Sequence, residues 1–588
     1  MSHPLHTVVS RVDRRIYLGL FVALLGCAAT PTKARKADDT AHLKLELEKR
    51  ETVLGAMKTE LERSMSLLKL DDYEAPYFLG YQIKDEHVVT IAGKYGALTG
   101  VDETRQRYVY VETRVGDYAF DNYANVDSES YRQSDFRADR RAPVEADVAA
   151  LRGTLWLLTD EGYKKALSDY LTKRGGAVYT TRDKAEVPSF SKEEALVQRA
   201  PAQPLSLDKE RWERLVREAT ASMRTAPFLL DSSMEVSARR VVRYLVTSEG
   251  ADIIDEHTIY SINAQAYTRA EDGMLLENGR MFYARDLARL PDDAAIKASI
   301  TEMVAELLLL RDAPAINPYT GPAILDAEAA GVLFHEAVGH RLEGERQRDE
   351  QEGRTFKGRV GQVVIPTFLS VYDDPTQAEH EGVQLNGYYA HDDEGVVAQP
   401  VTLIEHGILR GFLMSRTPIE GVLRSNGHGR AQGIYKPRAR MANLIVKADP
   451  EHAVSRERLQ EMLIEEVKRQ NKPYGLIIRD ITGGSTNTQG YGYQAFKGIP
   501  RLIYRVDPES GAQTLVRGVE LVGTPLSSIN KIVAASNKAG IFNGYCGAES
   551  GYVPVSTVAP ALLTTEIELQ RTQQGREKGP ILPPPWNE

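Results

Sequence analysis

The sequence predicts an α+β protein in which an N-terminal mixed α/β domain precedes a β-rich C-terminal domain. The 588-residue chain is too long for a single hydrophobic core. Helix-like and strand-like segments alternate up to about residue 320, whereas short apolar runs between glycine-rich turns dominate residues 360–570. The segment DAPAINPYTGPA (312–323), which contains three prolines, separates the two regions and marks the predicted domain boundary.

Composition narrows the class of protein. The chain is 42% hydrophobic and 26% charged, which is ordinary for a globular fold. Its net charge of −9 gives no reason to expect a nucleic acid partner. No apolar run reaches the 18 or more residues of a membrane-spanning helix.

Residues 1–26 resemble a bacterial lipoprotein signal peptide. Three arginines precede the apolar run IYLGLFVALLG, which ends at Cys27. This pattern implies that Cys27 is lipidated, and that the protein is exported and held at the cell envelope by a lipid anchor alone, on the periplasmic or outer surface. The alternative is an ordinary signal peptide or short anchor in which Cys27 has no role. Cys546 is the second of only two cysteines.

The N-terminal elements follow from hydrophobic periodicity. Residues 27–71 are expected to form a tether and one long amphipathic helix, and residues 72–320 the N-terminal domain. In that domain the residue pattern predicts strands at Tyr108–Tyr123 and Met234–Tyr283, and helices at Trp156–Arg174, Leu207–Arg224 and Ala294–Arg311.

Residues 321–588 form the predicted C-terminal domain. A helix is expected at Asp326–His340, with Asp326 as its N-cap, near the junction of the two domains. A second helix at Arg456–Gln470 interrupts the β-rich stretch 360–570.

The stretch FHEAVGHRL (Phe334–Leu342) carries the strongest chemical signal. His335 and His340 are candidate metal ligands, and Glu336 between them could take a proton from an attacking water. The five-residue step places the histidines about 140° apart on a regular helix, so both can face one metal only if the helix bulges or ends at Val338–Gly339. A third ligand is needed, and either Cys546 or Glu343 could supply it; Cys546 is preferred because a single exported thiol otherwise lacks a role.

Several further motifs resemble those of the TldD/PmbA metalloproteases, in the same order along the chain. They are FHEAVGHRLEG (Phe334–Gly344), DDEG (Asp392–Gly395), IEHGILRGFL (Ile404–Leu413), SNGHGR (Ser425–Arg430), PRARMANLIV (Pro437–Val446) and CGAESGYVPVS (Cys546–Ser556). The resemblance implies a peptidase that binds one Zn²⁺ per chain through His335, His340 and Cys546, with Glu336 as general base. It also implies a homodimer, or a heterodimer with a paralogue. The apparent lipoprotein signal and a longer N-terminal region distinguish this chain from the family.

Other polar groups are candidates for supporting roles. Glu343, Asp392 and Asp393 could orient a ligand histidine, although Glu343 could equally be a surface group and the two aspartates an acidic surface turn. His428 and Arg430 could stabilise an oxyanion or bind a substrate carboxylate, or could be solvated loop residues.

The expected function is zinc-dependent hydrolysis of peptide bonds in extended or unfolded polypeptides. One alternative is a lipid-anchored, inactive partner subunit that binds peptides by strand addition. A second is a metal-dependent amide hydrolase acting on a substrate that is not a protein.

Overall fold

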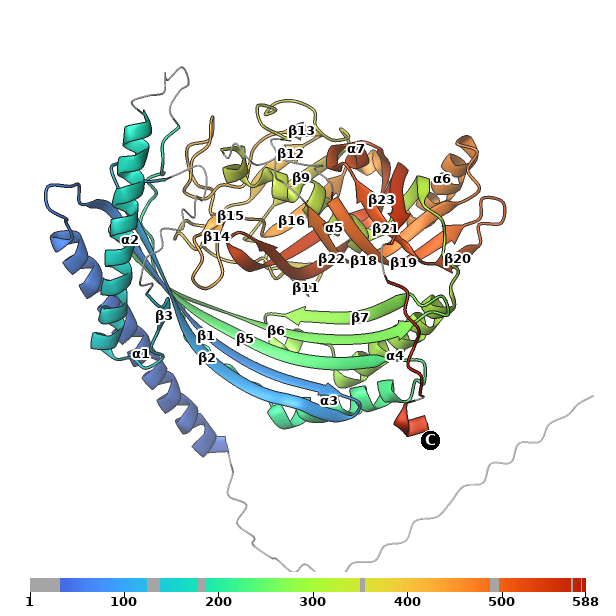
Figure 1. The fold of residues 1–588 in the computed structure, drawn as a ribbon, viewed down its shortest axis with the longest axis horizontal. Coiled ribbons are helices and arrows are strands. Elements are labelled where there is room, and N and C mark those ends of the chain that lie inside the picture. The colour runs from blue at the N-terminus through green and yellow to red at the C-terminus, as the bar shows by residue number, and fades with distance from the viewer. Residues whose placement is uncertain are drawn as a thin grey trace, which may run out of the picture.

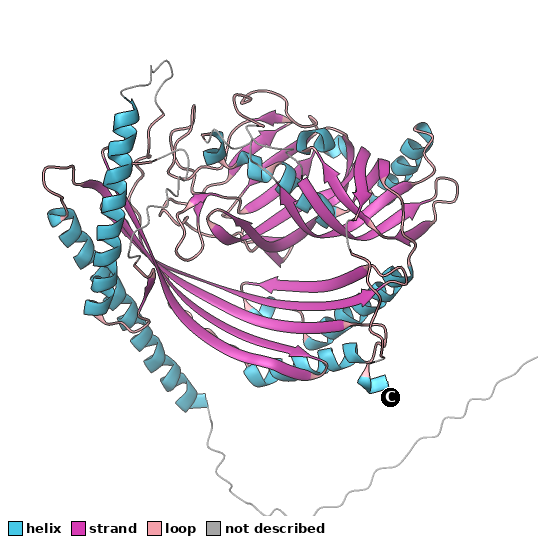
Figure 2. Ribbon diagram, viewed as in Figure 1, coloured by secondary structure: helices cyan, strands magenta, loops and turns pink. Residues whose placement is uncertain are grey.

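The computed structural model describes residues 32–123, 138–177, 187–348, 355–486, 496–572, 575–582 and 584–587. The predicted signal peptide and Cys27 lie outside these residues. Two extensive sheets with helices packed on them confirm the predicted α+β class (Figure 2). Among the described residues, no helix has the length and apolar character needed to cross a membrane.

The N-terminal sheet is built mainly from five long antiparallel strands, and one short strand pairs in parallel at its edge. Its order is β3-β2-β1-β5-β6-β4, with β7 paired to β6. The strands are β1 (Pro76–Lys94), β2 (Ala97–Val115), β3 (Arg141–Ala142), β4 (Val197–Arg199), β5 (Asp231–Thr247), β6 (Asp252–Arg269) and β7 (Leu275–Ala284). The strand expected at Tyr108–Tyr123 therefore begins earlier and ends at Val115, where Gly116 turns the chain with a φ of 109°.

Four helices cover one face of this sheet (Figure 1). They are α1 (Thr32–Leu67), α2 (Val148–Ala177), α3 (Lys209–Arg224) and α4 (Asp293–Asp312). Because side chains alternate along a strand, Ile83 and Tyr244 pack under α1 and α2, while Ile91 packs with Trp212 of α3. The intervening residues, including Lys84, point to the opposite face, on which the C-terminal region sits.

The C-terminal region is a 12-stranded sheet in the order β13-β12-β9-β16-β23-β21-β19-β18-β8, with β17, β20 and β22 paired off this path. The strands are β8 (Tyr319–Leu325), β9 (Leu369–Asp373), β12 (Val401–Glu405), β13 (Ile408–Leu409), β16 (Asn443–Ala448), β17 (Ala453–Val454), β18 (Gly475–Thr486), β19 (Phe496–Val506), β20 (Gln513–Val516), β21 (Val519–Gly523), β22 (Ile532–Ala548) and β23 (Gly551–Arg571). Two small ribbons add β10 (Glu379–His380) with β11 (Val383–Gln384), and β14 (Gly429–Arg430) with β15 (Arg438–Ala439).

Helices lie on both faces of this second sheet. On one face α5 (Ala327–Ala337) contributes Leu333 and Phe334 to the largest core, and the short helix α7 (Pro525–Ile529) adds Ile529. On the other face α6 (Arg456–Arg469) packs Leu459 on Ile324 of β8. Burial of α5 on the sheet fixes the direction of the histidines at its end.

Candidate metal centre

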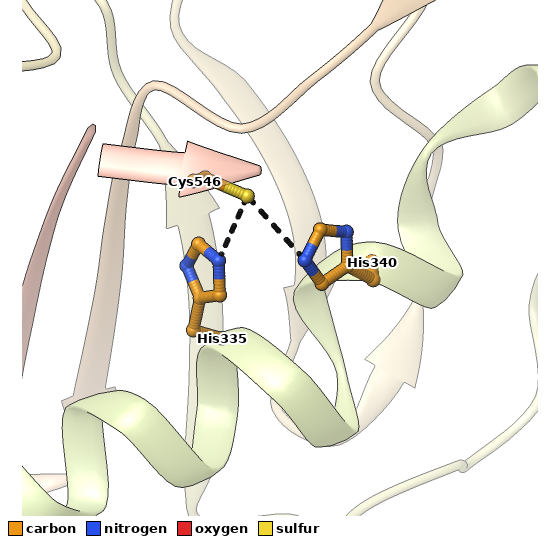
Figure 3. A group of neighbouring side chains, drawn as sticks. All are labelled: His335, His340 and Cys546. Carbon is orange, nitrogen blue, oxygen red and sulfur yellow. Dashed lines mark hydrogen bonds between the residues drawn. The ribbon is translucent and has the colours of Figure 1, made fainter. Parts of the chain in front are cut away.

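Helix α5 ends between the two histidines. It stops at Ala337, Val338 caps it, and Gly339–Leu342 continue as a 3₁₀ turn. The interruption expected at Val338–Gly339 is therefore present. It turns both imidazoles to the same side, as Figure 3 shows.

Gly339 has a steric reason for its place in this turn. A Cβ atom at this position would lie 2.0 Å from the sulfur of Met441, which precedes β16. The backbone φ of Gly339 is not in the left-handed region. Glycine is thus needed at this position for the close approach of Met441.

Cys546 reaches the two imidazoles from β22. Its Sγ lies 3.1 Å from Nε2 of His335 and 3.4 Å from Nε2 of His340. All three donor atoms lie within 4.8 Å of one another (Figure 3). The structure thus brings together all three residues expected as ligands, from helix, turn and strand.

Arg440 supports the thiol, although sequence reasoning gave it no role. Its buried guanidinium donates to the carbonyl of Cys546 at 2.7 Å and lies 3.1 Å from Sγ. Burial raises the pKa of the Cys546 thiol, but the electrostatic influence of His340, His335 and Arg440 outweighs burial and lowers this pKa well below its usual value. The thiolate is the form that binds metals, so this environment favours the ligand form.

Glu343 lies behind His340 and is not beside the sulfur. One carboxylate oxygen lies 3.1 Å from Nδ1 of His340, and the other accepts a 2.8 Å hydrogen bond from Arg346. Burial raises the pKa of Glu343, but His340 and Arg346 outweigh it and lower it to about 2. The buried carboxylate thereby orients the His340 ring with Nε2 toward Cys546, so Glu343 is neither a third ligand nor a surface group in this geometry.

Glu336 occupies a narrow space beside His335. Its side chain passes so close to β18 that a Cβ atom on Gly484 would lie 2.5 Å from its Cγ. Within the described part of the chain, no hydrogen bond occupies the Glu336 carboxylate; Arg341 binds only the backbone carbonyl of this residue. The carboxylate is therefore left available for a reacting molecule.

The acidic turn that contains Asp392 and Asp393 lies at the junction of the two sheets, away from His335 and His340. Asp393 pairs with Lys84 of β1 at 2.9 Å and with Arg243 of β5 at 2.9 Å. Asp392 is buried and accepts hydrogen bonds from the backbone of Val396 and Gly429. Asp392 is buried and Asp393 pairs with two cations, so they do not form a solvated surface turn, and among the described residues neither is hydrogen-bonded to His335 or His340.

His428 and Arg430 are buried and are not solvated loop residues. Nε2 of His428 lies 3.3 Å from Asp373, and its Nδ1 lies 3.0 Å from the side-chain oxygen of Asn426. Arg430 donates to the carbonyl of Met441 at 2.6 Å. These partners hold the loop in place, and they do not place either side chain against Cys546.

Two imidazoles and one thiolate form a donor set suited to a metal ion. The comparisons with known proteins point to metallopeptidases, which also bind a metal ion. Residues 318–571 match the family model described as the PmbA/TldA metallopeptidase C-terminal domain. Residues 318–571 are thus similar to the metallopeptidase domain that this model describes.

Curated relatives carry names of the same kind. The chain is 33% identical over 234 residues to a metalloprotease of Methanocaldococcus jannaschii, covering 40% of this chain and 47% of the relative. A TldD homologue of Haemophilus influenzae is 31% identical over 277 residues, covering 46% and 52%. A zinc metalloprotease TldD homologue of Saccharolobus solfataricus is 28% identical over 250 residues, covering 42% and 51%. The chain therefore spans about half the length of the curated relatives it matches.

Solved structures extend the similarity of fold to most of the chain. TldE from Thermococcus kodakarensis superposes with a TM-score of 0.55 at 14% identity, covering 88% of this chain and all of that one. A protein from Thermotoga maritima gives a TM-score of 0.56 at 16% identity, covering 87% of this chain. At these identities the likeness shows the fold alone.

Proposed function

We propose that this protein is a zinc-dependent metallopeptidase that hydrolyses extended or unfolded polypeptides. The observation that carries the proposal is the convergence of His335, His340 and Cys546, whose donor atoms lie within 4.8 Å of one another; Glu336 follows His335 directly in α5. Zinc is the metal proposed because imidazole and thiolate are its usual protein ligands and one relative is named a zinc metalloprotease. An extended substrate is proposed because His340 and Glu336 are buried, so a compact folded surface would not reach them.

The protein residues divide the work between binding and proton transfer. When bound, zinc supplies a Lewis acid that polarises the scissile carbonyl and acidifies the attacking water. Glu336 accepts the proton of that water on a carboxylate oxygen and passes it to the leaving amine. Glu343 and Arg440 position His340 and Cys546, respectively.

Replacement of Glu336 tests the proposal. Glu336→Gln should retain one zinc per chain and lose at least about 10²-fold in peptide cleavage, because the amide cannot accept the proton. Glu328→Gln on the exposed first turn of α5 is the matched control and should cleave normally. Metal analysis and a peptide-cleavage assay on the wild type and on both variants test this role of Glu336. Near-normal cleavage by Glu336→Gln would remove this carboxylate from the reaction.

Glu336 also bears on the two alternatives. A partner subunit that only binds peptides needs no general base, so the presence of Glu336 favours an enzyme. Hydrolysis of a non-protein amide would require the same chemistry. In that case the wild type would cleave no peptide in the assay, whereas it would hydrolyse the amide and Glu336→Gln would not. A dimer, with a second copy or a paralogue, is proposed from the family resemblance.

The proposed location is the bacterial cell envelope, with lipid on Cys27. Cys27→Ser is then expected to release the protein from membranes or to block its maturation. Fractionation of cells followed by mass spectrometry of the N-terminal peptide measures both effects. Membrane association that persists without lipid on this peptide would reject the anchor.

A further inference from the structure

A second site lies between the two sheets. A cavity of about 230 Å³ is bounded by β5 and β6 on one side and by loops 386–393 and 430–433 and the β22–β23 hairpin on the other. Figure 1 shows this hairpin above the long strands of the N-terminal sheet. The cavity wall therefore comes from segments far apart in the sequence.

The cavity is distinct from the candidate metal centre. Neighbouring residues on a strand point to opposite faces. Cys546 points from β22 toward α5, whereas Tyr545 points toward the N-terminal sheet, where its ring meets that of Tyr283. Tyr545 lines the cavity and Cys546 does not. Strand β22 thus separates the two sites.

Most of the charge around the cavity is compensated. Its wall contains five cationic side chains, and three of these form ion pairs: Lys84 with Asp393, Arg239 with Glu86, and Arg243 with Asp255. Glu256 pairs with Arg240, behind the wall. Burial lowers the pKa of His257 to about 3 and that of His391 to about 4, so both are neutral near physiological pH.

Arg285 and Arg430 are the two cations that remain. Arg285 donates to the carbonyl of Tyr388 at 2.6 Å and stacks on the ring of that residue. Arg430 donates to the carbonyl of Met441 and lies over the ring of Tyr389. Throughout the described segments, neither guanidinium has a carboxylate within ion-pair distance. Burial lowers the pKa of both, and it outweighs the opposing effect of carboxylates beyond ion-pair distance, Asp255 for Arg285 and Asp393 for Arg430.

Asn386 and Asp392 are two further polar residues on the cavity wall. Both side-chain polar atoms of Asn386 are buried and have no hydrogen-bond partner among the described residues. The Asp392 carboxylate accepts backbone N–H groups of Val396 and Gly429, and among the described residues it meets no cation at ion-pair distance. A buried amide without a partner costs free energy unless a ligand or water satisfies it.

We propose that this cavity binds a small oxyanion, a carboxylate or phosphate group, through Arg285, Arg430 and the amide of Asn386. Guanidinium groups bind such anions with charge-assisted, often paired hydrogen bonds. The rings of Tyr388, Tyr389 and Tyr545 surround the space left for the rest of the molecule. The volume restricts the ligand to a small molecule or to the end of a longer one. This site does not depend on the peptidase proposal.

Calorimetric titration of the full chain tests the site. The probes are inorganic phosphate, N-acetylglycine with its free carboxylate, and N-acetylglycinamide as the uncharged match. We expect saturable binding of one or both anions and none of the amide. Binding of phosphate alone would identify a phosphate ligand, and binding of N-acetylglycine alone a carboxylate ligand.

Substitutions assign the binding to the cavity. The double variant Arg285→Gln, Arg430→Gln should bind the anion at least about tenfold more weakly. The reason is that each lost charge-assisted hydrogen bond lowers the affinity by a factor of about this size. Asn386→Asp should also abolish binding by placing a negative charge on the wall, and it serves as the test if the double variant fails to fold. Arg410→Gln removes an exposed guanidinium elsewhere and should bind normally. Absence of saturable anion binding to the wild type, or unchanged binding in the double variant or in Asn386→Asp, would overturn the proposal.

Discussion

Glu336 owes its position to the absence of a side chain on the opposing strand. Gly484 of β18 passes so close that an added Cβ would lie 2.5 Å from Cγ and 2.9 Å from a carboxylate oxygen of Glu336. The neighbouring Gly483 has open space where its Cβ would lie. The two adjacent glycines thus differ in their surroundings, since a Cβ at Gly484 would meet Glu336 and also lie 2.9 Å from Cγ1 of Val332, whereas one at Gly483 would meet nothing within 4 Å among the described residues.

Alanine substitutions at the two glycines exploit this difference. Gly484→Ala should lower kcat by about tenfold or more while leaving zinc content unchanged, because the methyl group displaces the carboxylate from its place beside His335. Gly483→Ala should be close to wild type. Steady-state kinetics with metal analysis measures both, and equal rates for the two variants would show that contact with Gly484 does not position Glu336.

The proposed metal ligands could be predicted from the sequence better than the side chains that are hydrogen-bonded to these ligands. His335 and Glu336 stand next to each other in one motif, and Cys546 was preferred as third ligand because a single exported thiol otherwise lacks a role. Arg440 was missed because its partner is 106 residues away, and no local pattern pairs an arginine with a distant thiol. Glu343 was expected near the site, but its burial against His340 depends on packing that the motif does not encode.

At the level of elements, periodic segments were predicted well and context-dependent ones less so. The apolar repeat in Ala294–Arg311 predicts α4 almost to its ends. Strand β1 was not predicted from its residues, because one of its faces packs on helices while the other carries Gln82 and Lys84, which are buried only through contact with the C-terminal region. The end of α5 was predictable only because the chemistry of one metal requires both histidines on one side.

At the level of the whole molecule, Asp393 links the two sheets. Its carboxylate faces Lys84 and Arg243, and Gln82 donates to its carbonyl at 2.7 Å. Burial lowers the pKa of Lys84. Burial also disfavours the charged form of Asp393, but the two cations outweigh it and hold the pKa of that carboxyl well below its usual range. Because its carboxylate faces two cations, Asp393 is stabilised in its ionised form.

Asp393→Asn should destabilise the fold in a manner that depends on pH. Loss of a buried charge partner costs about 3–5 kcal/mol near neutral pH. A lowered pKa contributes stability that is full above the ordinary carboxyl pKa and is lost as the pH falls below it. The difference between wild type and variant should therefore shrink on acidification. Chemical denaturation at neutral and acidic pH measures this, with the exposed Asp139→Asn as the control expected to change little. A difference that stays constant with pH would rule out this linkage.

We propose that His335, His340 and Cys546 bind one metal ion. The most direct test is the absorption spectrum of the protein loaded with Co²⁺, in which a thiolate ligand produces a charge-transfer band. We predict this band in the wild type and in Glu336→Gln, and its loss in Cys546→Ser. A Cys546→Ser spectrum identical to that of the wild type would contradict the assignment of Cys546 as a ligand.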